Sequence, residues 1–230
     1  GLLAGSQALA GDMAALGLPR GKIAVHYTGL DRDLFRPLDR IECRRRIAEH
    51  FGFALPKGAP LLSSIGALIP RKGQEHAIRA LARLPGTRLV LVGTGPDRAR
   101  LEALARSVGV GERVHFLGSL DHTLLPVVLS ASDAMVLPSA SEGLANAWVE
   151  AIACGCPLVI TDAGGARELV TSDTAGRIVE CDAGAIADAV TALLADPPER
   201  AAVAATADRF SWRSHADALD RIYSELIRMS

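Results

Sequence analysis

The sequence predicts an α/β fold with a doubly wound parallel sheet. Short apolar runs rich in β-branched residues alternate along the chain with helical segments, a pattern typical of a parallel sheet covered by helices. Several runs are almost continuously apolar, as expected of strands buried on both faces. The runs expected to be strands are residues 23–27, 61–68, 88–93, 113–118, 134–138, 157–161 and 176–180.

The segments between these runs show helical periodicity. Residues 73–84 place Leu81 and Leu84 on one apolar stripe, which predicts a helix that packs on the sheet. Residues 97–109 carry a similar stripe and end at a glycine, the residue type that most often terminates a helix. A helix is therefore expected after each of these strands, joined to the next by a right-handed crossover.

The two ends of the chain are expected to be helical as well. Residues 5–19 form a predicted helix with a Gly-Leu-Pro stop, and they precede the first predicted strand. Residues 208–229 form a predicted amphipathic helix, for which Ser211 is the expected N-terminal cap. No internal repeat and no long linker separates these ends from the predicted sheet.

The composition favours an ordinary globular protein. The chain has 230 residues, of which 49% are apolar and 22% are charged, enough for one large or two small domains with a core. Its net charge of −1 gives no indication of a nucleic-acid partner. No apolar run reaches the roughly 18 residues of a membrane span and no signal peptide is visible, so a cytoplasmic location is expected.

No metal site is expected. The four cysteines fit no disulfide framework for a chain of this length. Cys154 and Cys156 have one residue between them, which is tight for zinc, so they are interpreted as small buried residues. Asp31 and Asp33 match a metal-holding Asp-x-Asp motif, but they lie away from a clear strand end, and the match is interpreted as chance.

The first candidate ligand loop lies at residues 64–74. The strand ends at Gly66, and Arg71 and Lys72 then precede a glycine and a predicted helix. Two adjacent cations before a helix N-terminus suit a phosphate group. The alternative is a solvated basic turn. The loop is not a P-loop, because the glycine spacing and the Lys-Ser/Thr pair are missing.

Two further loops carry paired glycines after a strand. Residues 92–101 contain two, but the dinucleotide fingerprint would need a small residue where Arg98 stands. The loop therefore indicates a tight turn beside some nucleotide more than it indicates NAD. Residues 161–170 contain Gly164, Gly165 and Glu168, and a ligand loop and a simple tight turn are both open there.

The segment 141–155 places two carboxylates around a predicted helix start. Asn146 is the expected N-cap, and Glu150 then lies about one turn into the helix, whereas Glu142 lies in the preceding loop. These carboxylates are either charges that stabilise the helix N-terminus or acceptors for ligand hydroxyls, with a phosphate on the helix N–H groups. Phosphorylated sugars and the riboses of nucleotides carry both hydroxyls and phosphate.

Taken together, these loops resemble one family over essentially the whole chain. The sequence resembles the C-terminal domain of family 4 glycosyltransferases, the retaining GT-B enzymes often called group 1. Glu142 and Glu150 match the family's E-x(7)-E motif, "IGALIPRKG" matches its G-R-L-x-x-x-K-G loop, and "HYTGLDRDLFRP" matches its I-P-N-G-V-D-x-x-x-F-x-P segment. The resemblance implies a Rossmann-like domain that binds a nucleotide-sugar, without a further cofactor or a bound metal.

The resemblance also implies a role for each matching residue. Glu142 would lie beside the transferred sugar as the catalytic residue, and Glu150 would accept hydrogen bonds from the ribose hydroxyls. Lys72 would offset the diphosphate charge. The donor-binding residues implied beside Glu150 are Gly66, Arg71, Lys72, Leu117, Gly118, Gly143, Leu144 and Ala145, of which Leu117 and Gly118 would lie near the base.

The chain departs from the family pattern at several positions, and T-G-L-D at residues 28–31 replaces N-G-V-D. Ala67 stands where the family has a loop arginine, with Arg71 as the candidate substitute, and Ala145 replaces the second glycine of E-G-F-G. Residues 1–20 are interpreted as the remnant of the last helix of a missing N-terminal acceptor domain, and residues 21–230 as the nucleotide-sugar-binding domain. The fragment alone is therefore expected to be inactive.

Three functions stay open from the sequence. The favoured one is the donor-binding domain of a retaining, metal-independent glycosyltransferase whose acceptor binds to the missing domain. The full-length protein would then associate with a membrane peripherally if its acceptor lies there. A GT-B-type phosphorylase or epimerase is the first alternative, and a non-catalytic nucleotide-binding module is the second. The E-x(7)-E motif with Lys72 favours transfer.

Overall fold

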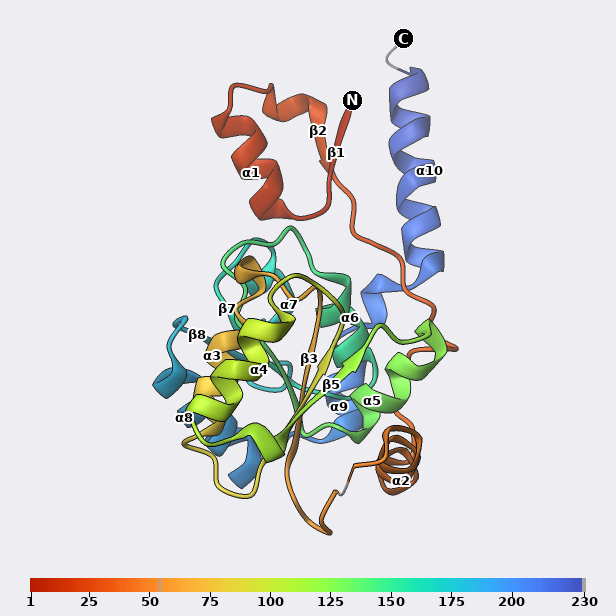
Figure 1. Cartoon of the computed structure of the whole chain (residues 1–230). Coiled ribbons are helices and arrows are strands. Elements are labelled where there is room, and N and C mark those ends of the chain that lie inside the picture. Colours follow the sequence, from red (N-terminus) through yellow and green to blue (C-terminus); the bar gives the residue numbers. More distant parts are fainter. Residues whose placement is uncertain (54, 229–230) are drawn as a thin grey trace.

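The computed structural model describes residues 1–53 and 55–228, and its centre is a six-stranded parallel sheet (Figure 1). The strand order is β5-β4-β3-β6-β7-β8. The chain therefore builds outward from β3 to β5 and then crosses back to β6 on the other side of β3, which confirms the doubly wound prediction. The strands are β3 (Leu61–Ile65), β4 (Arg88–Val92), β5 (Val114–Gly118), β6 (Ala134–Leu137), β7 (Leu158–Thr161) and β8 (Gly176–Val179).

Helices cover both faces of this sheet, which explains the continuous apolar runs. In β4, Val90 and Val92 face one buried cluster while Leu89 and Leu91 face the other, as the two-residue period of a strand requires. The first cluster includes residues of α2 (Arg40–Phe51), α5 (Leu125–Ala131), α6 (Asn146–Ala153) and α9 (Arg200–Ala205). The second includes residues of α3 (Gln74–Leu81), α4 (Arg98–Ser107) and α8 (Ala183–Ala195).

The N-terminal residues form a small unit of their own above the sheet (Figure 1). It consists of β1 (Leu2–Ala4), α1 (Gln7–Ala15) and β2 (Ile23–Val25), with β1 parallel to β2. The strand predicted at 23–27 therefore exists, but it pairs with β1 and not with the six-stranded sheet. The three-residue β1 is too short to show a strand pattern in the sequence. The boundary placed at residue 20 falls between its two strands, and the origin of residues 1–20 in an acceptor domain stays a prediction.

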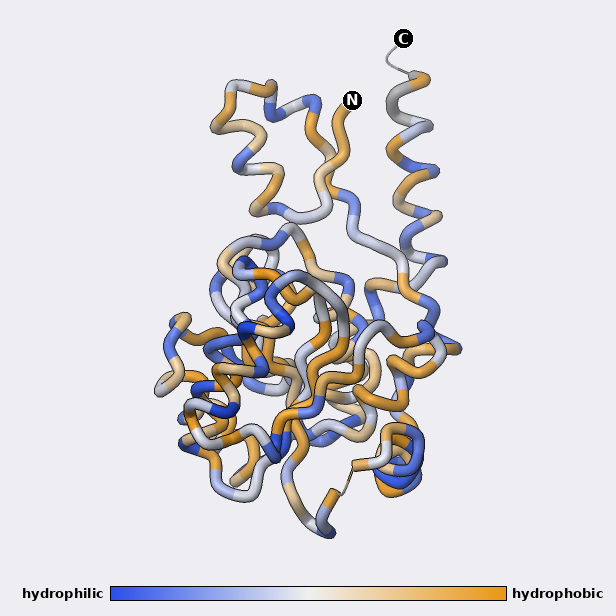
Figure 2. The backbone as a smooth tube through the Cα atoms, in the orientation of Figure 1, coloured by the Kyte–Doolittle hydropathy of each residue, from blue (hydrophilic) through white to orange (hydrophobic). Residues whose placement is uncertain are grey.

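The last helix, α10 (Trp212–Arg228), projects from the body on the same side as this unit (Figure 1). The hydroxyl of Ser211 accepts a hydrogen bond from the backbone N–H of Ser214 at 3.1 Å, which confirms the predicted cap. Residue 229, where the prediction ended, lies outside the described residues. Apolar and polar residues alternate along α10 (Figure 2). Within residues 1–53 and 55–228, no helix is both long enough and apolar enough to cross a membrane.

The loop after β3 is held against the end of β6 by a close backbone contact. A short 3-10 turn at Pro70–Lys72 ends at Gly73, which has a φ angle of 67°. A Cβ atom at Gly73 would lie 2.1 Å from the carbonyl oxygen of Pro138, which follows β6. The backbone N–H of Ala140 also donates to the carbonyl oxygen of Arg71 at 2.8 Å. Glycine therefore lets the two loops touch.

Gly73→Ala is expected to destabilise the protein more than Gly109→Ala. Both glycines have a left-handed backbone conformation, but a Cβ at Gly109 would meet nothing within 4 Å. Gly109→Ala should therefore lower the free energy of unfolding only by the conformational cost of alanine there, about 1–2 kcal/mol. Gly73→Ala should lose about 1–3 kcal/mol more, because its Cβ overlaps a backbone oxygen. Urea unfolding of both variants measures the difference, and equal losses would contradict the close contact.

Candidate functional site

The carboxyl ends of β3, β4 and β5 are aligned by backbone contacts in which glycines take part. The N–H of Gly66 donates to the carbonyl oxygen of Val92 at 2.9 Å, and the N–H of Gly93 donates to that of Gly118 at 2.8 Å. A Cβ at Gly93 would lie 2.1 Å from the carbonyl oxygen of Gly66. The loops after β3, β4 and β5 therefore begin side by side, at the edge where open α/β sheets bind ligands.

Lys72 and Glu142 meet across this edge from opposite sides of the strand reversal. The Nζ atom of Lys72 lies 2.6 Å from Oε1 of Glu142, and the two side chains are 15% and 7% exposed. The stem of Lys72 passes over Gly66, where an added Cβ would lie 3.5 Å from Cδ and Cε. Nη1 of Arg71 lies 3.6 Å from Oε2 of Glu142 and donates to the carbonyl oxygen of Ser141. Two cations thus surround one carboxylate, which leaves this cluster with a net positive charge.

The loop at 143–145 is held in place from the other side by the double glycine. The N–H of Gly165 donates to the carbonyl oxygen of Gly143 at 2.6 Å. A Cβ at Gly164 would lie 2.0 Å from the carbonyl oxygen of Glu142. Leu144 and Ala145 pack partly into the core. The double glycine therefore acts as a tight turn that positions the loop next to it.

Glu150 is buried within the first turns of α6, at 8% exposure. Its Oε1 atom lies 3.3 Å from Nε2 of His122. Burial raises the pKa of the Glu150 carboxyl above its ordinary value, and His122 opposes the shift. The predicted cap at Asn146 is wrong. Ala145 takes the extended N-cap conformation, and Asn146 is the first helical residue, with no capping hydrogen bond from Ala145.

A hollow of about 190 Å³ opens beside Glu150. His122, Asn146 and Val149 line it together with residues 28–31, Phe35 and Trp212. The hollow thus joins the start of α6 to the segment after β2 and to the first residue of α10. A buried carboxylate at the wall of a hollow with mixed polar and apolar lining can accept hydrogen bonds from a polyhydroxy ligand.

Asp31 also lines this hollow, but its carboxylate serves a local turn. Its Oδ1 atom accepts hydrogen bonds from the N–H groups of Asp33 and Leu34 at 2.9 and 3.1 Å. These hydrogen bonds account for the carboxylate of Asp31 at this position without a ligand. Across residues 1–53 and 55–228, no three His, Cys, Asp or Glu side chains are grouped as metal ligands would be.

Leu117 and Gly118 lie at the same edge, at the end of β5. Leu117 packs partly against the core, and Gly118 has a φ angle of 72° with open space where a Cβ would stand. Neither residue lines the hollow around Glu150. The structure therefore brings them to the predicted edge, two strands away from Lys72.

His122 is the residue that the sequence analysis missed. It stands in a short 3-10 turn, His122–Leu124, between β5 and α5. The six histidines are scattered along the sequence, and no spacing relates this one to Glu150. Only the return of the chain from β5 to β6 brings the two side chains together.

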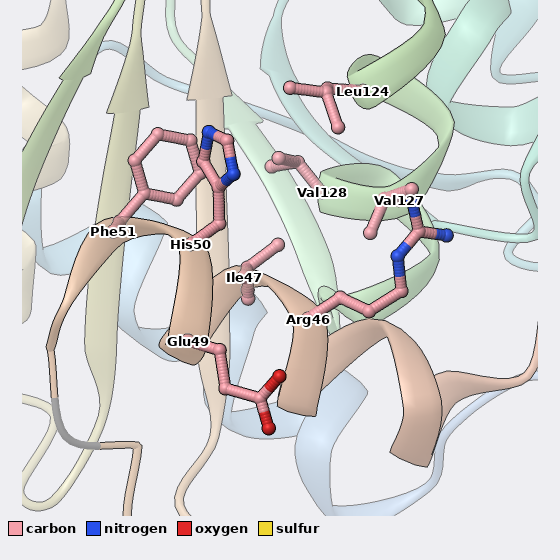
Figure 3. Close-up of a pocket in the computed structure, with 8 residues that line it drawn as sticks. All are labelled: Arg46, Ile47, Glu49, His50, Phe51, Leu124, Val127 and Val128. Atoms are coloured by element: carbon pink, nitrogen blue, oxygen red, sulfur yellow. The ribbon is translucent and has the colours of Figure 1, made fainter.

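A larger hollow of about 350 Å³ lies between α2 and α5 (Figure 3). Ile47, Val127 and Val128 line it from both helices, and Arg46, Glu49 and His50 come from α2 (Figure 3). It contains none of the predicted site residues. The carboxylate of Glu49 is held by Arg45 at 2.7 Å, so it is already paired within α2.

Comparison with known proteins decides the family. The model of the family described as "Glycosyl transferases group 1" matches residues 45–210. The chain belongs to the group 1 glycosyl transferases. This confirms the predicted resemblance and the Rossmann-like domain of the GT-B type.

Two relatives within the group are 34% identical to this chain. One is the GDP-mannose-dependent α-(1-6)-phosphatidylinositol monomannoside mannosyltransferase of Mycolicibacterium smegmatis, matched over 85% of this chain and 54% of the relative. The other is the D-inositol 3-phosphate glycosyltransferase of Mycobacterium tuberculosis, matched over 92% of this chain and 45% of the relative. The chain therefore spans about half the length of the curated relatives it matches.

Solved structures of similar fold support the same assignment. Sucrose-phosphate synthase from Thermosynechococcus elongatus superposes with a TM-score of 0.84 at 28% identity, over 99% of this chain and 58% of that one. Anabaena HepE in complex with UDP-glucose superposes with a TM-score of 0.84 at 26% identity, over 96% of this chain and 63% of that one.

Substituting the two glutamates is expected to change stability in opposite directions. The folded pKa of Glu150 is raised, so its contribution to stability is fully present below the unfolded pKa and is lost as pH rises through the folded pKa. Glu150→Gln should therefore raise the melting temperature near neutral pH. The gain should vanish below the ordinary glutamate pKa of about 4.3.

Glu142→Gln is the matched control in the same melting experiment. It removes the negative charge that faces the largely buried Lys72 and should lower the free energy of unfolding by about 1 kcal/mol. Melting curves of both variants between acid and neutral pH measure the effect. A loss of stability in Glu150→Gln at neutral pH would show that this carboxylate stabilises the apo protein, as a helix-capping charge would.

Proposed function

We propose that this chain is the donor-binding part of a retaining, metal-independent glycosyltransferase that uses a nucleotide-diphosphate sugar. The observation that carries the proposal is the meeting of Lys72 and Glu142 at 2.6 Å, on the same sheet edge as the buried Glu150. A cation suits the diphosphate of such a donor. One carboxylate suits the hydroxyl groups of the sugar, and a second carboxylate suits those of the ribose. The names of two similar proteins support the donor class, because one uses GDP-mannose and the other holds UDP-glucose.

Each group of the site has a role in the proposed reaction. The positively charged cluster of Arg71 and Lys72 attracts the diphosphate and stabilises the negative charge that develops on it as a leaving group. The bond from the sugar's anomeric carbon to the diphosphate oxygen breaks, and the bonding electrons leave with the diphosphate. The acceptor oxygen bonds to that carbon on the same face, and its proton passes to the diphosphate. Glu142 lies where it can bind the sugar, and Glu150 binds the ribose hydroxyls.

The cations make a bound metal unnecessary in this proposal. Magnesium in other nucleotide enzymes offsets phosphate charge, and here two basic side chains stand at the same place. No further cofactor is proposed. The acceptor would bind outside this chain, in the part of the protein that the relatives have and this chain does not span.

Two features of the full-length protein belong to the same proposal. It would act in the cytoplasm, where nucleotide-sugars are made. It would reach a membrane peripherally if its acceptor resembles the phosphatidylinositol monomannoside in the name of the Mycolicibacterium smegmatis relative.

The isolated chain is expected to bind UDP or GDP and to transfer no sugar. Calorimetric titration with each diphosphate, in EDTA and then in magnesium, measures affinity and metal dependence. Equal affinity in both buffers supports the proposal, whereas affinity that collapses in EDTA contradicts it. Transfer of sugar to an acceptor by this chain alone would contradict the assignment of the acceptor to another domain.

Glu150→Gln serves as the control for specific binding in that titration. It should weaken the binding of the nucleoside monophosphate and of the diphosphate by the same factor, because both ligands carry the ribose. A non-catalytic nucleotide module would pass this binding test. Turnover of a nucleotide-sugar by the full-length protein then separates an enzyme from such a module.

Lys72→Ala is expected to weaken diphosphate binding more than Arg71→Ala. Lys72 is 15% exposed and Arg71 is 48% exposed, and a better-shielded cation contributes more to a phosphate contact. A lost charge-assisted hydrogen bond of about 1.5–3 kcal/mol corresponds to a roughly 10- to 150-fold weaker Kd. Arg71→Ala should raise the Kd for the diphosphate by less than about fivefold. Equal losses would show that Arg71 has taken the role of the arginine absent at position 67.

A further inference from the structure

One carboxylate of the six-stranded domain accepts hydrogen bonds from the N-terminal unit and from the segment that follows it. Glu168 stands on α7 (Ala166–Leu169), directly after the double glycine. Its Oε2 atom accepts hydrogen bonds from the backbone N–H of Gln7 at 2.9 Å and from the Tyr27 hydroxyl at 2.7 Å. Its Oε1 atom accepts from the N–H of Ala8 at 3.2 Å. The residues it holds lie more than 140 positions away in the sequence.

The first turn of α1 depends on this carboxylate. Ser6 caps the N–H of Leu9 at 3.0 Å, and Glu168 takes the N–H groups of the two preceding residues. The helix has nine residues and no acidic residue in its own first turn. Helices this short are marginal by themselves, and a negative charge at the N-terminus stabilises them. Here that charge comes from the other part of the molecule.

Gly165, the N-cap residue of α7, touches the proposed donor loop. The N–H of Gly165 donates to the carbonyl oxygen of Gly143 at 2.6 Å. A Cβ at Gly165 would lie 3.0 Å from Cδ1 of Leu144 and 3.1 Å from Cβ of Ser6. Gly165 is therefore enclosed between the donor loop and the cap of α1. A shift of the loop at 143–145 has to move α7, because no free space separates them.

Arg209 holds the same junction from a third direction. Its guanidinium donates to the backbone carbonyl oxygen of Glu168 and lies 5.3 Å from the ring centroid of Tyr27. A cation over an aromatic face stabilises the contact. Glu168 thus has a fixed position relative to Tyr27, which lies in the segment that leaves β2.

We propose that Glu168 is a positioning residue that couples occupancy of the donor loop to the order of α1. The coupling rests on the proposed function of the loop at 143–145. A diphosphate that orders this loop restrains Gly165, which restrains α7 and keeps the Glu168 carboxylate on the first turn of α1. Coupling of this kind is reciprocal, so an ordered α1 in turn favours the ligand-binding form of the loop.

Hydrogen exchange measured by mass spectrometry, with and without UDP or GDP, tests this coupling. The diphosphate used is the one that binds in the titration. In the wild type, the ligand should slow exchange in a peptide over the donor loop and also, by about threefold or more, in a peptide that covers residues 7–15. In Glu168→Ala, the loop should still be protected and the Kd should stay within about threefold, but the protection of α1 should be lost.

Two further variants separate coupling from plain structural support. Tyr27→Phe removes one hydrogen bond and leaves the carboxylate on α1, so the ligand should still protect residues 7–15. Glu168→Gln keeps the packing and loses the charge, and it should reduce that protection only in part. It also serves as the test variant if Glu168→Ala does not fold.

The outcomes distinguish this inference from the proposed function. If the ligand slows hydrogen exchange in the donor loop of the wild type but leaves exchange in α1 unchanged, the coupling is overturned and the proposed function is not. Protection of α1 that persists in both Glu168 variants would overturn the role of this residue. Absence of any diphosphate binding would overturn the proposed function, and the coupling with it.

Discussion

The reversal of the chain at β3 is the constraint on which the rest of the structure depends. β3 pairs in parallel with β4 on one side and with β6 on the other. The helix that follows β3 packs on one face of the sheet, and the helix that follows β6 packs on the opposite face. The two loops therefore start from neighbouring strand ends and lead to opposite faces, which is where open α/β sheets bind ligands. Lys72 and Glu142 come one from each loop and meet at 2.6 Å.

Glycine lets the backbones of neighbouring strand-end loops approach each other closely. At Gly73 and Gly164, a Cβ atom would overlap a carbonyl oxygen of the neighbouring loop, at 2.1 and 2.0 Å. Each glycine thus joins a strand-end loop to the loop beside it. Peptide groups held at such distances cannot shift separately, so a ligand that contacts one loop also restrains the loop beside it.

Under the proposed function, the burial of Glu150 serves the binding of a ligand more than the stability of the protein. Burial holds the pKa of Glu150 above its ordinary value, so its ionised form destabilises the folded chain at neutral pH. Its polar neighbour in the structure is the mostly exposed His122. A carboxylate that only capped the helix would not need burial. Ligand hydroxyls would supply the hydrogen bonds that this carboxylate lacks, which is how a binding site trades stability for function.

The sequence alone determined the positions of strands β3 to β8 along the chain, the doubly wound class of the fold and the loops proposed to carry the site. Those features follow from local patterns, because apolar runs covered on both faces and glycines at strand ends need no distant partner to be recognised. The tertiary structure decided the rest. His122 meets Glu150, Glu168 caps α1, and β2 pairs with β1, and each contact joins residues whose separation in the sequence carries no signal. Asn146 failed as a cap because the preceding loop sets the backbone of Ala145. Local propensity can suggest a helix start, but the loop geometry fixed by neighbouring strands selects the residue.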